Sequence, residues 1–345
     1  MPLTDVRPLQ EGLSFGARIG GVTAAMTRDP AIREEINDIF HAKGVIIFEG
    51  VEPSDAMQLA LSEVFGPLKE HPVKNVSRVD ANAMPGVVEI RSPAGSGGVV
   101  ELDGRQLSHW LPWHFDHAYN DELNYAGILR ATEIVEEGGL TGFCDGIALY
   151  NVFPRDMLAR IEGKTIIYTL NTQYETMRFG RPDAFKVIRP KPTPPGFEEE
   201  ARKMPRALHP AVWARDTGEK VLHISPWMAE GILGMETPEG DALLEEVCRT
   251  INALAVQHSY FHKWKPTDMA IWDNLRALHS VSGNRPEDGR TMQRTTIKGD
   301  YGLGRFENNA QGGVKGSPVF SVLRAIFATN IPTGAASVCV EVVRR

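Results

Sequence analysis

The residues in this sequence with the clearest chemical potential are a histidine and an aspartate two positions apart. They lie in the stretch Trp113-His114-Phe115-Asp116. Side chains two residues apart on an extended strand point to the same face, so an imidazole and a carboxylate would project together. Such a pair holds a metal ion when a third ligand joins it. His279, in the segment IWDNLRALH, is the best candidate for that ligand, and Asn274 is expected to support the turn that presents it.

Two histidines and one carboxylate leave the identity of the metal open. This set, with free positions on one side of the ion, is the facial triad of non-haem Fe(II) oxygenases. Zinc hydrolases also use two histidines and a carboxylate. A histidine and an aspartate at this spacing also occur on surfaces without any function. The adjacent His117 should point away from His114, and we interpret it as structural.

Two arginines follow His279 in the run RTMQRTTIKGD, whose alternation is typical of a strand. Arg290 and Arg294 are four residues apart and therefore share a face of that strand. Guanidinium groups turned into a β core carry a large desolvation cost unless anions neutralise them. The pair favours a dicarboxylate cosubstrate and an anionic substrate, which a zinc hydrolase would not need.

The elements that must position these residues begin with a mixed helical and extended region. Asp29 is a predicted N-cap for a helix that Gly44 ends. The apolar run 45–48 predicts a buried strand, and a second helix is expected from Pro53 and Ser54 to about Phe65.

From Trp113 onward, short apolar segments alternate with turns, which predicts a β-sandwich or barrel. The expected strands cover residues 125–131, 141–145, 165–170, 220–224, 269–273 and 291–298. The glycine-rich stretch 92–98 predicts a surface loop that could cover a site. The stretch 173–207 matches neither helix nor strand, and we interpret it as a long excursion from the β core.

Motifs in order over most of the chain resemble the family of taurine dioxygenase and 2,4-dichlorophenoxyacetate dioxygenase, the Fe(II)- and 2-oxoglutarate-dependent oxygenases. They are GARIGGV from residue 16, GVIIF from 44, FGPLKEHPV from 65, WHFD from 113, EGGLTGFCD from 137, HPAV from 209, WDNLRALH from 272 and RTMQR from 290. Each motif is weak alone, and their ordered combination is specific. The resemblance implies a mostly β fold with flanking helices, a double-stranded β-helix or jelly-roll of the cupin-like kind. Within this fold we expect the irregular stretch at about 173–207 to be a lid insertion and the residues at about 304–345 to be a C-terminal extension.

The resemblance also implies roles for individual residues. His114, Asp116 and His279 resemble the iron ligands of the family. Thr141 and Arg290 resemble the pair that holds the distal carboxylate of 2-oxoglutarate. Arg294 is similar to the second family arginine, which assists cosubstrate binding and meets an anionic substrate in several members. His71 resembles the histidine that contacts the sulfonate in taurine dioxygenase.

The activity implied by the resemblance is oxidation by O2 of a small, anionic organic substrate, with release of succinate and CO2. Hydroxylation, oxidative cleavage and desaturation are all compatible with it. Two alternatives are open. One is a facial-triad metal oxygenase that does not use 2-oxoglutarate, and the other is a jelly-roll protein that binds a metal or ligand without turnover.

Composition narrows the partners and the domain organisation. The chain has 345 residues and a formal net charge of −7, so nucleic acid and anionic membranes are not expected partners. Three scattered cysteines and the absence of a recognisable targeting signal predict a cytoplasmic protein. Because residues 114 and 279 must meet at one ion, we expect a single catalytic domain over residues 1–345. We also expect a homo-oligomer, a dimer or tetramer.

Overall fold

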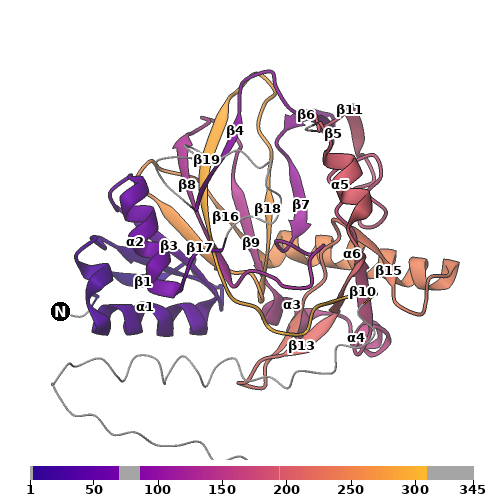
Figure 1. Cartoon of the computed structure of the whole chain (residues 1–345), viewed down its shortest axis with the longest axis horizontal. Coiled ribbons are helices and arrows are strands. Elements are labelled where there is room, and N and C mark those ends of the chain that lie inside the picture. Colours follow the sequence, from indigo (N-terminus) through magenta and orange to yellow (C-terminus); the bar gives the residue numbers. More distant parts are fainter. Residues whose placement is uncertain (1–2, 70–85, 194, 309–345) are drawn as a thin grey trace, which may run out of the picture. The chain divides into compact units, whose positions relative to one another are not determined.

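Two β-sheets form the centre of the fold (Figure 1). The computed structural model describes residues 3–69, 86–193 and 195–308. The larger sheet has seven strands in the order β1 (Val6–Pro8), β2 (Ala17–Gly20), β3 (Val45–Glu49), β17 (Met269–Asp273), β8 (Ala126–Glu133), β19 (Arg290–Ile297) and β4 (Val87–Ser92). The smaller sheet has four strands in the order β16 (Ser259–His262), β9 (Thr141–Asp145), β18 (Ala277–Val281) and β7 (Leu111–His114).

Strand β3 shows why the larger sheet is buried on both faces. Val45 and Ile47 pack in one apolar cluster with Phe143 of the smaller sheet. Ile46 and Phe48 point the other way, into a cluster shared with the first two helices. Because alternate residues of a strand face opposite sides, a continuous apolar run fits a strand between two cores.

Helices α1 (Pro30–Lys43) and α2 (Asp55–Phe65) cover the outer face of the larger sheet (Figure 1). The Asp29 carboxylate accepts a hydrogen bond from the Ala31 N–H at 2.9 Å, as expected of an N-cap. Gly44 ends α1 with a φ of 74°, a conformation that favours glycine. The short helix η1 (Met26–Arg28) precedes α1. The predicted strand at 45–48 and both predicted helices are therefore confirmed.

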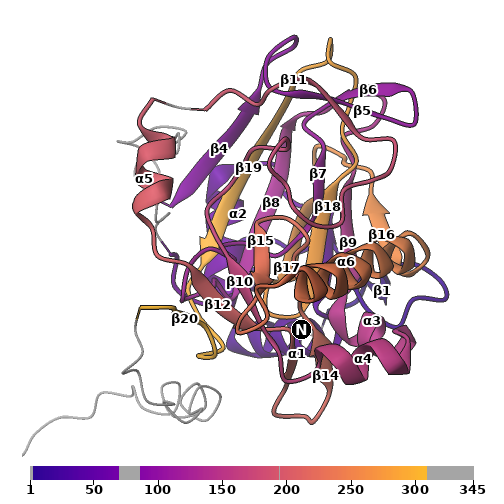
Figure 2. The ribbon, with the colours of Figure 1, turned by 90° about the vertical axis from the view of Figure 1, so that its right-hand side faces the viewer.

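A third layer packs beside the smaller sheet. Its elements are α3 (Gly146–Val152), α4 (Arg155–Ile161), α6 (Pro238–His258), a sheet of β15 (Ala229–Ile232), β10 (Thr165–Tyr168), β12 (Ala207–Pro210) and β20 (Arg305–Phe306), and the pair β13 (Val212–Ala214) and β14 (Lys220–Leu222). Helix α6 contacts α3, β15 and β9 (Figure 2). Leu222, Leu244 and Leu278 join this layer to the smaller sheet in one buried cluster.

The stretch 173–207 is more regular than the sequence indicated. It contains β11 (Lys186–Arg189) and α5 (Phe197–Lys203). Strand β11 pairs with β5 (Val99–Leu102), which pairs with β6 (Arg105–Ser108). The prediction of no regular structure in 173–207 was wrong: β11 depends on a partner strand far away in the sequence, and α5 is a short helix without buried residues to mark it. Residues 93–98 do lack regular structure, as expected.

The residues that the structure describes up to 308 belong to one compact unit. Of the predicted C-terminal extension, the structure describes residues 304–308, which include β20. A single catalytic domain over the whole chain thus stays a prediction. No helix in the described ranges is long and apolar enough to cross a membrane.

Candidate metal centre and anion-binding residues

His114 and His279 face each other across two neighbouring strands. They are register partners in the antiparallel pair β7 and β18, and their ring centroids are 4.0 Å apart. The Nδ1 atom of His114 lies 2.8 Å from the Pro112 carbonyl oxygen. A carbonyl only accepts hydrogen bonds, so Nδ1 must carry the proton and Nε2 keeps a free lone pair. This is the tautomer that a metal ligand requires.

Asp116 completes a group of three buried side chains. One ligand atom from each of His114, Asp116 and His279 lies within 4.8 Å of the others. The Oδ1 atom of Asp116 is 3.6 Å from Nε2 of His279. Two imidazole nitrogens and one carboxylate oxygen suit a divalent transition metal, so the donor set fits iron(II). Strand β7 ends at His114, and Asp116 lies in the turn that follows it, yet the two side chains meet as the spacing predicted.

Arg294 of β19 forms a bidentate salt bridge with the carboxylate of Asp116. Its two terminal nitrogens donate to Oδ1 at 2.8 Å and Oδ2 at 2.7 Å. Burial alone would raise the pKa of Asp116, but Arg294 and the two histidines hold that pKa well below its usual range. The carboxylate is therefore ionised at neutral pH and ready to bind a cation.

The side chain of Asn274 holds the backbone of Asp116. Its side-chain oxygen accepts from the Asp116 N–H at 2.7 Å, and its amide nitrogen donates to the Asp116 carbonyl at 3.1 Å. The same nitrogen contacts Asn124 at 3.1–3.2 Å. Asn274 itself lies in the turn that leads into β18, so these bonds tie the turn before His279 to the turn after β7.

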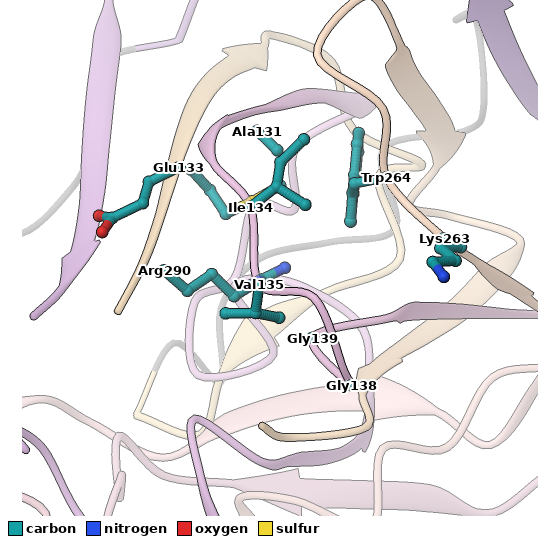
Figure 3. A pocket seen from close by; sticks show the side chains of 10 residues that line it. Ala131, Glu133, Ile134, Val135, Gly138, Gly139, Lys263, Trp264 and Arg290 are labelled. Atoms are coloured by element: carbon teal, nitrogen blue, oxygen red, sulfur yellow. The ribbon is translucent and has the colours of Figure 1, made fainter. Parts of the chain in front are cut away.

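Arg290 lies four residues before Arg294 on the same strand and is buried without an ion pair among the described residues. Desolvation lowers its pKa to about 10. Its nearest hydrogen-bonding neighbour is the Thr141 hydroxyl, 3.5 Å from its terminal nitrogen. Figure 3 shows Arg290 beside Val135 and the turn at Gly138 and Gly139, in a small pocket that Trp264 also lines.

Thr141 is oriented by a residue that sequence reasoning missed. The Trp264 indole N–H donates to the Thr141 hydroxyl oxygen at 3.0 Å. That oxygen already accepts a hydrogen bond, so its own proton is free to be donated to an incoming group. No spacing rule links residue 264 to residue 141, since the contact joins the loop after β16 to the start of β9.

A cavity of about 120 Å³ opens beside the three-residue group. Its lining includes the candidate ligands His114 and Asp116 and a set of larger side chains: His117, Tyr119, Trp227, Met228 and Arg294. His117 lines the cavity with His114, contrary to expectation. Its φ of 60° breaks the strand alternation on which that expectation rested.

Gly127 of β8 makes room for the arginine. A Cβ atom at this position would lie 3.0 Å from the Trp272 ring and 3.3 Å from a terminal nitrogen of Arg294. The signal available in the sequence was a glycine inside an apolar strand, which often marks a close approach. His71, the predicted sulfonate-type contact, lies outside the described residues.

Comparisons with known proteins agree with this geometry. The family described as taurine catabolism dioxygenase TauD, TfdA family matches residues 5–296. An α-ketoglutarate-dependent 2,4-dichlorophenoxyacetate dioxygenase of Cupriavidus pinatubonensis is 27% identical over 77% of this chain and 88% of that protein. Pentalenolactone F synthase of Streptomyces arenae is 26% identical, over 84% of this chain and 94% of its own length. An (S)-phenoxypropionate/α-ketoglutarate dioxygenase of Sphingobium herbicidovorans is also 26% identical, over 87% and 96%.

Solved structures share the fold. A taurine dioxygenase from Burkholderia xenovorans superposes with a TM-score of 0.62 at 23% identity, over 87% of this chain and 92% of that one. AAD-2 in complex with Mn(II) and N-oxalylglycine superposes with a TM-score of 0.63 at 22% identity, over 86% and 97%. The predicted mostly β, jelly-roll fold is confirmed, and so is the predicted class of enzyme. The chain belongs to the taurine catabolism dioxygenase TauD, TfdA family.

Proposed function

We propose that this protein is an Fe(II)- and 2-oxoglutarate-dependent dioxygenase that oxidises a small anionic organic molecule by O2. Hydroxylation, oxidative cleavage or desaturation would be the outcome, with release of succinate and CO2. The observation that carries the proposal is the convergence of His114, Asp116 and His279 on one buried point. Arg290, a desolvated cation without an ion pair in the described ranges, lies on the strand that also supplies Arg294.

The three converging residues would hold iron(II). The metal would supply O2 activation and the oxidising power for the substrate. The chain's contribution is to fix the ligands: Pro112 sets the tautomer of His114, and Asn274 clamps the backbone of Asp116. The mostly buried surroundings keep bulk water from the ligands.

Arg290 and Thr141 would hold the distal carboxylate of 2-oxoglutarate. A planar guanidinium binds a carboxylate through two parallel hydrogen bonds, and a desolvated one gains most from the incoming negative charge. The Thr141 proton, left free by the bond from Trp264, adds a further donor. Arg294 would contact the cosubstrate or substrate once a metal competes for Asp116.

The relatives support an anionic substrate. Their names include dioxygenases of phenoxyacetate, phenoxypropionate and sulfate esters, all of which are anions at neutral pH. The cavity beside the metal ligands offers Tyr119, Trp227 and Met228 to an organic body and Arg294 to a charge. His71 is proposed as a substrate contact on the family resemblance.

Anaerobic titration tests the proposal. Fe(II) and 2-oxoglutarate added together should produce an absorption band near about 500 nm, as expected of an iron(II) keto-acid chelate at an open N/O site. The Asp116→Ala variant, with one ligand removed, should not produce it. Uptake of Fe(II) without the band would favour a facial-triad oxygenase that does not use 2-oxoglutarate, and absence of O2 consumption with any substrate would favour a binding protein.

The quaternary state and location predicted for the chain also stay proposals. Light scattering on the purified protein would distinguish a monomer from the expected dimer or tetramer. Fractionation of the source cells would test the expected cytoplasmic location.

A further inference from the structure

The stretch 173–207 carries three lysines, and two of them have carboxylate partners. Lys186 pairs with Glu101 at 2.8 Å, and Lys203 pairs with Glu199 at 2.6 Å. The ammonium group of the third, Lys191, forms no ion pair or hydrogen bond in the part of the chain that the structure describes. Burial is the only cause that shifts its pKa, and the pKa is lowered.

Lys191 lies beside Trp227, one of the residues that line the cavity next to the candidate metal ligands. Its ammonium nitrogen is 5.7 Å from the centre of the Trp227 ring, and Trp227 lines that cavity. The Trp227 ring in turn meets the His114 ring edge-on at 5.1 Å. Arg294 lines the same cavity as Trp227. Trp227 therefore lies near two cations, Lys191 beside its ring and Arg294 in the cavity.

The position of Lys191 is fixed by its backbone. The Gln173 side chain donates to the Lys191 carbonyl at 3.3 Å. Gly98 lies against the other side, where a Cβ atom would come within 3.0 Å of the Lys191 Cα. Arg189 adds hydrogen bonds to the Gly97 and Ser96 carbonyls. The lysine is therefore held in place by the glycine-rich loop and not by a charge partner.

A second unsatisfied group lies nearby. The Nε2 atom of His109 is buried without a hydrogen-bond partner among the described residues. Burial lowers the His109 pKa to about 4, and the charges of Arg290 and Lys191 contribute to the shift. An oxyanion beside Lys191 would neutralise a desolvated cation, which otherwise costs free energy.

We propose that Lys191 forms an anion subsite with the face of Trp227, and that this subsite selects substrates with one carboxylate, sulfonate or sulfate group. The inference rests on the proposed function for the identity of the neighbouring metal site. It adds a residue from the 173–207 segment to the determinants of specificity. The organic part of the substrate would then lie along Trp227 toward His114, with its charge held away from the metal.

Matched pairs of probes test the subsite. Phenoxyacetate is compared with phenoxyacetamide, and benzenesulfonate with benzenesulfonamide, because each pair differs mainly in charge. The protein is loaded with Fe(II) and 2-oxoglutarate without O2. Binding of each probe is then measured by the change that it causes in the absorption band at about 500 nm. Wild-type protein should bind the anions more tightly. Lys191→Met should weaken them about tenfold or more, as expected for loss of a desolvated charge-assisted hydrogen bond, and leave the neutral probes unchanged.

Two further variants control this comparison. Lys191→Arg should restore most of the preference for anions. Lys203→Met, an exposed lysine of the same segment, should behave as wild type. Equal binding of the charged and neutral members by the wild-type chain would overturn the proposal, and so would loss of 2-oxoglutarate affinity in Lys191→Met with the anion preference intact.

A measurement without metal separates this inference from the proposed function. Isothermal titration of the metal-free chain with benzenesulfonate and with benzenesulfonamide measures the binding of a charged and a neutral probe directly. The wild-type chain should bind the sulfonate more tightly than the sulfonamide. Lys191→Met should weaken sulfonate binding about tenfold or more and leave sulfonamide binding unchanged. Unchanged sulfonate binding in Lys191→Met would overturn the subsite even if the chelate band appears, and the expected loss of sulfonate binding without that band would contradict only the proposed function.

Discussion

At the residue scale, the negative charge of Asp116 in the candidate metal centre is balanced by the positive charge of Arg294. The guanidinium of Arg294 donates hydrogen bonds to both oxygens of the ionised carboxylate. A carboxylate buried without a cation would instead have a raised pKa and would resist ionisation. Binding of a metal by Asp116 would therefore require Arg294 to share or release the carboxylate, and a released Arg294 would then be available to an anionic cosubstrate or substrate.

A substitution of Arg290 tests whether this arginine contributes to 2-oxoglutarate binding and not to metal binding. Arg290→Ala should weaken 2-oxoglutarate binding by more than about thirtyfold, since a buried guanidinium contributes about 2 kcal/mol or more to a carboxylate. Fe(II) affinity should change by less than about threefold. Isothermal titration with Mn(II) and then with 2-oxoglutarate measures both.

Arg285 offers a matched control, because it is exposed and pairs with Asp288 on the loop before β19. Arg285→Ala should leave both affinities at wild-type values. Equal loss of metal and 2-oxoglutarate in Arg290→Ala would contradict the role assigned to Arg290.

At the scale of elements, three adjacent strands of the larger sheet create the space for Arg294. Its guanidinium lies 5.4 Å from the Trp272 ring of β17, above Gly127 of β8. Gly127→Ala would push a methyl group toward both side chains, which must then shift by a few tenths of an ångström. We expect a loss of about 1–2 kcal/mol in the free energy of unfolding, typical of overpacking, with weakened Mn(II) binding. Urea denaturation and metal titration measure the two effects.

Gly231 of β15 serves as the control for this substitution. It is buried, and a Cβ atom there would meet only Glu236, at an ordinary 3.7 Å. Gly231→Ala should change stability by less than about 0.5 kcal/mol. A Gly127→Ala variant as stable as Gly231→Ala would show that the strand spacing around Arg294 is looser than described.

The elements that the sequence predicted well are those with local signals. Asp29, Gly44 and the apolar run 45–48 mark α1 and β3 through capping and periodicity, which act over a few residues. β11 was missed because its residues are mostly exposed and its order comes from pairing with β5, and α5 was missed because none of its residues is buried. Long-range pairing also explains the missed contacts of Trp264 with Thr141 and of Asn274 with Asp116. Such contacts join segments more than 100 residues apart, and no pattern along one sequence encodes them.

At the scale of the whole molecule, buried histidines should make the fold sensitive to acid. Burial lowers the pKa of His209 to about 4 and that of His223 to about 3. In the unfolded chain both histidines would titrate near 6.5. At pH values between the folded and the unfolded pKa, the unfolded state binds more protons than the folded state. The free energy of unfolding therefore falls as the pH drops. Asp273 opposes this, because burial raises its pKa to about 6 and the folded state takes up its proton first.

For His209, His223 and Asp273 together, the expectation is a loss of about 2–3 kcal/mol in the free energy of unfolding between about pH 7 and pH 5. His109, whose pKa burial also lowers to about 4, adds to this loss. The Leu275 N–H donates to the Asp273 carboxylate at 3.0 Å, and Asp273→Asn keeps an oxygen that can accept this hydrogen bond. This variant should be more stable at neutral pH and lose stability more steeply on acidification, by about 1 kcal/mol over the same range. Urea midpoints at several pH values measure both slopes. A variant with a shallower slope than wild type would contradict the assignment for Asp273.

The pairing of β11 with β5 has a consequence for protein engineering. The two segments, one before the metal motif and one after it, share a small sheet and the apolar cluster of Val100, Tyr174 and Phe185. A chimera that receives only one of them from a relative would expose unpaired strand edges and half of an apolar cluster. Both segments should therefore be exchanged together when substrate preference is transplanted into this scaffold.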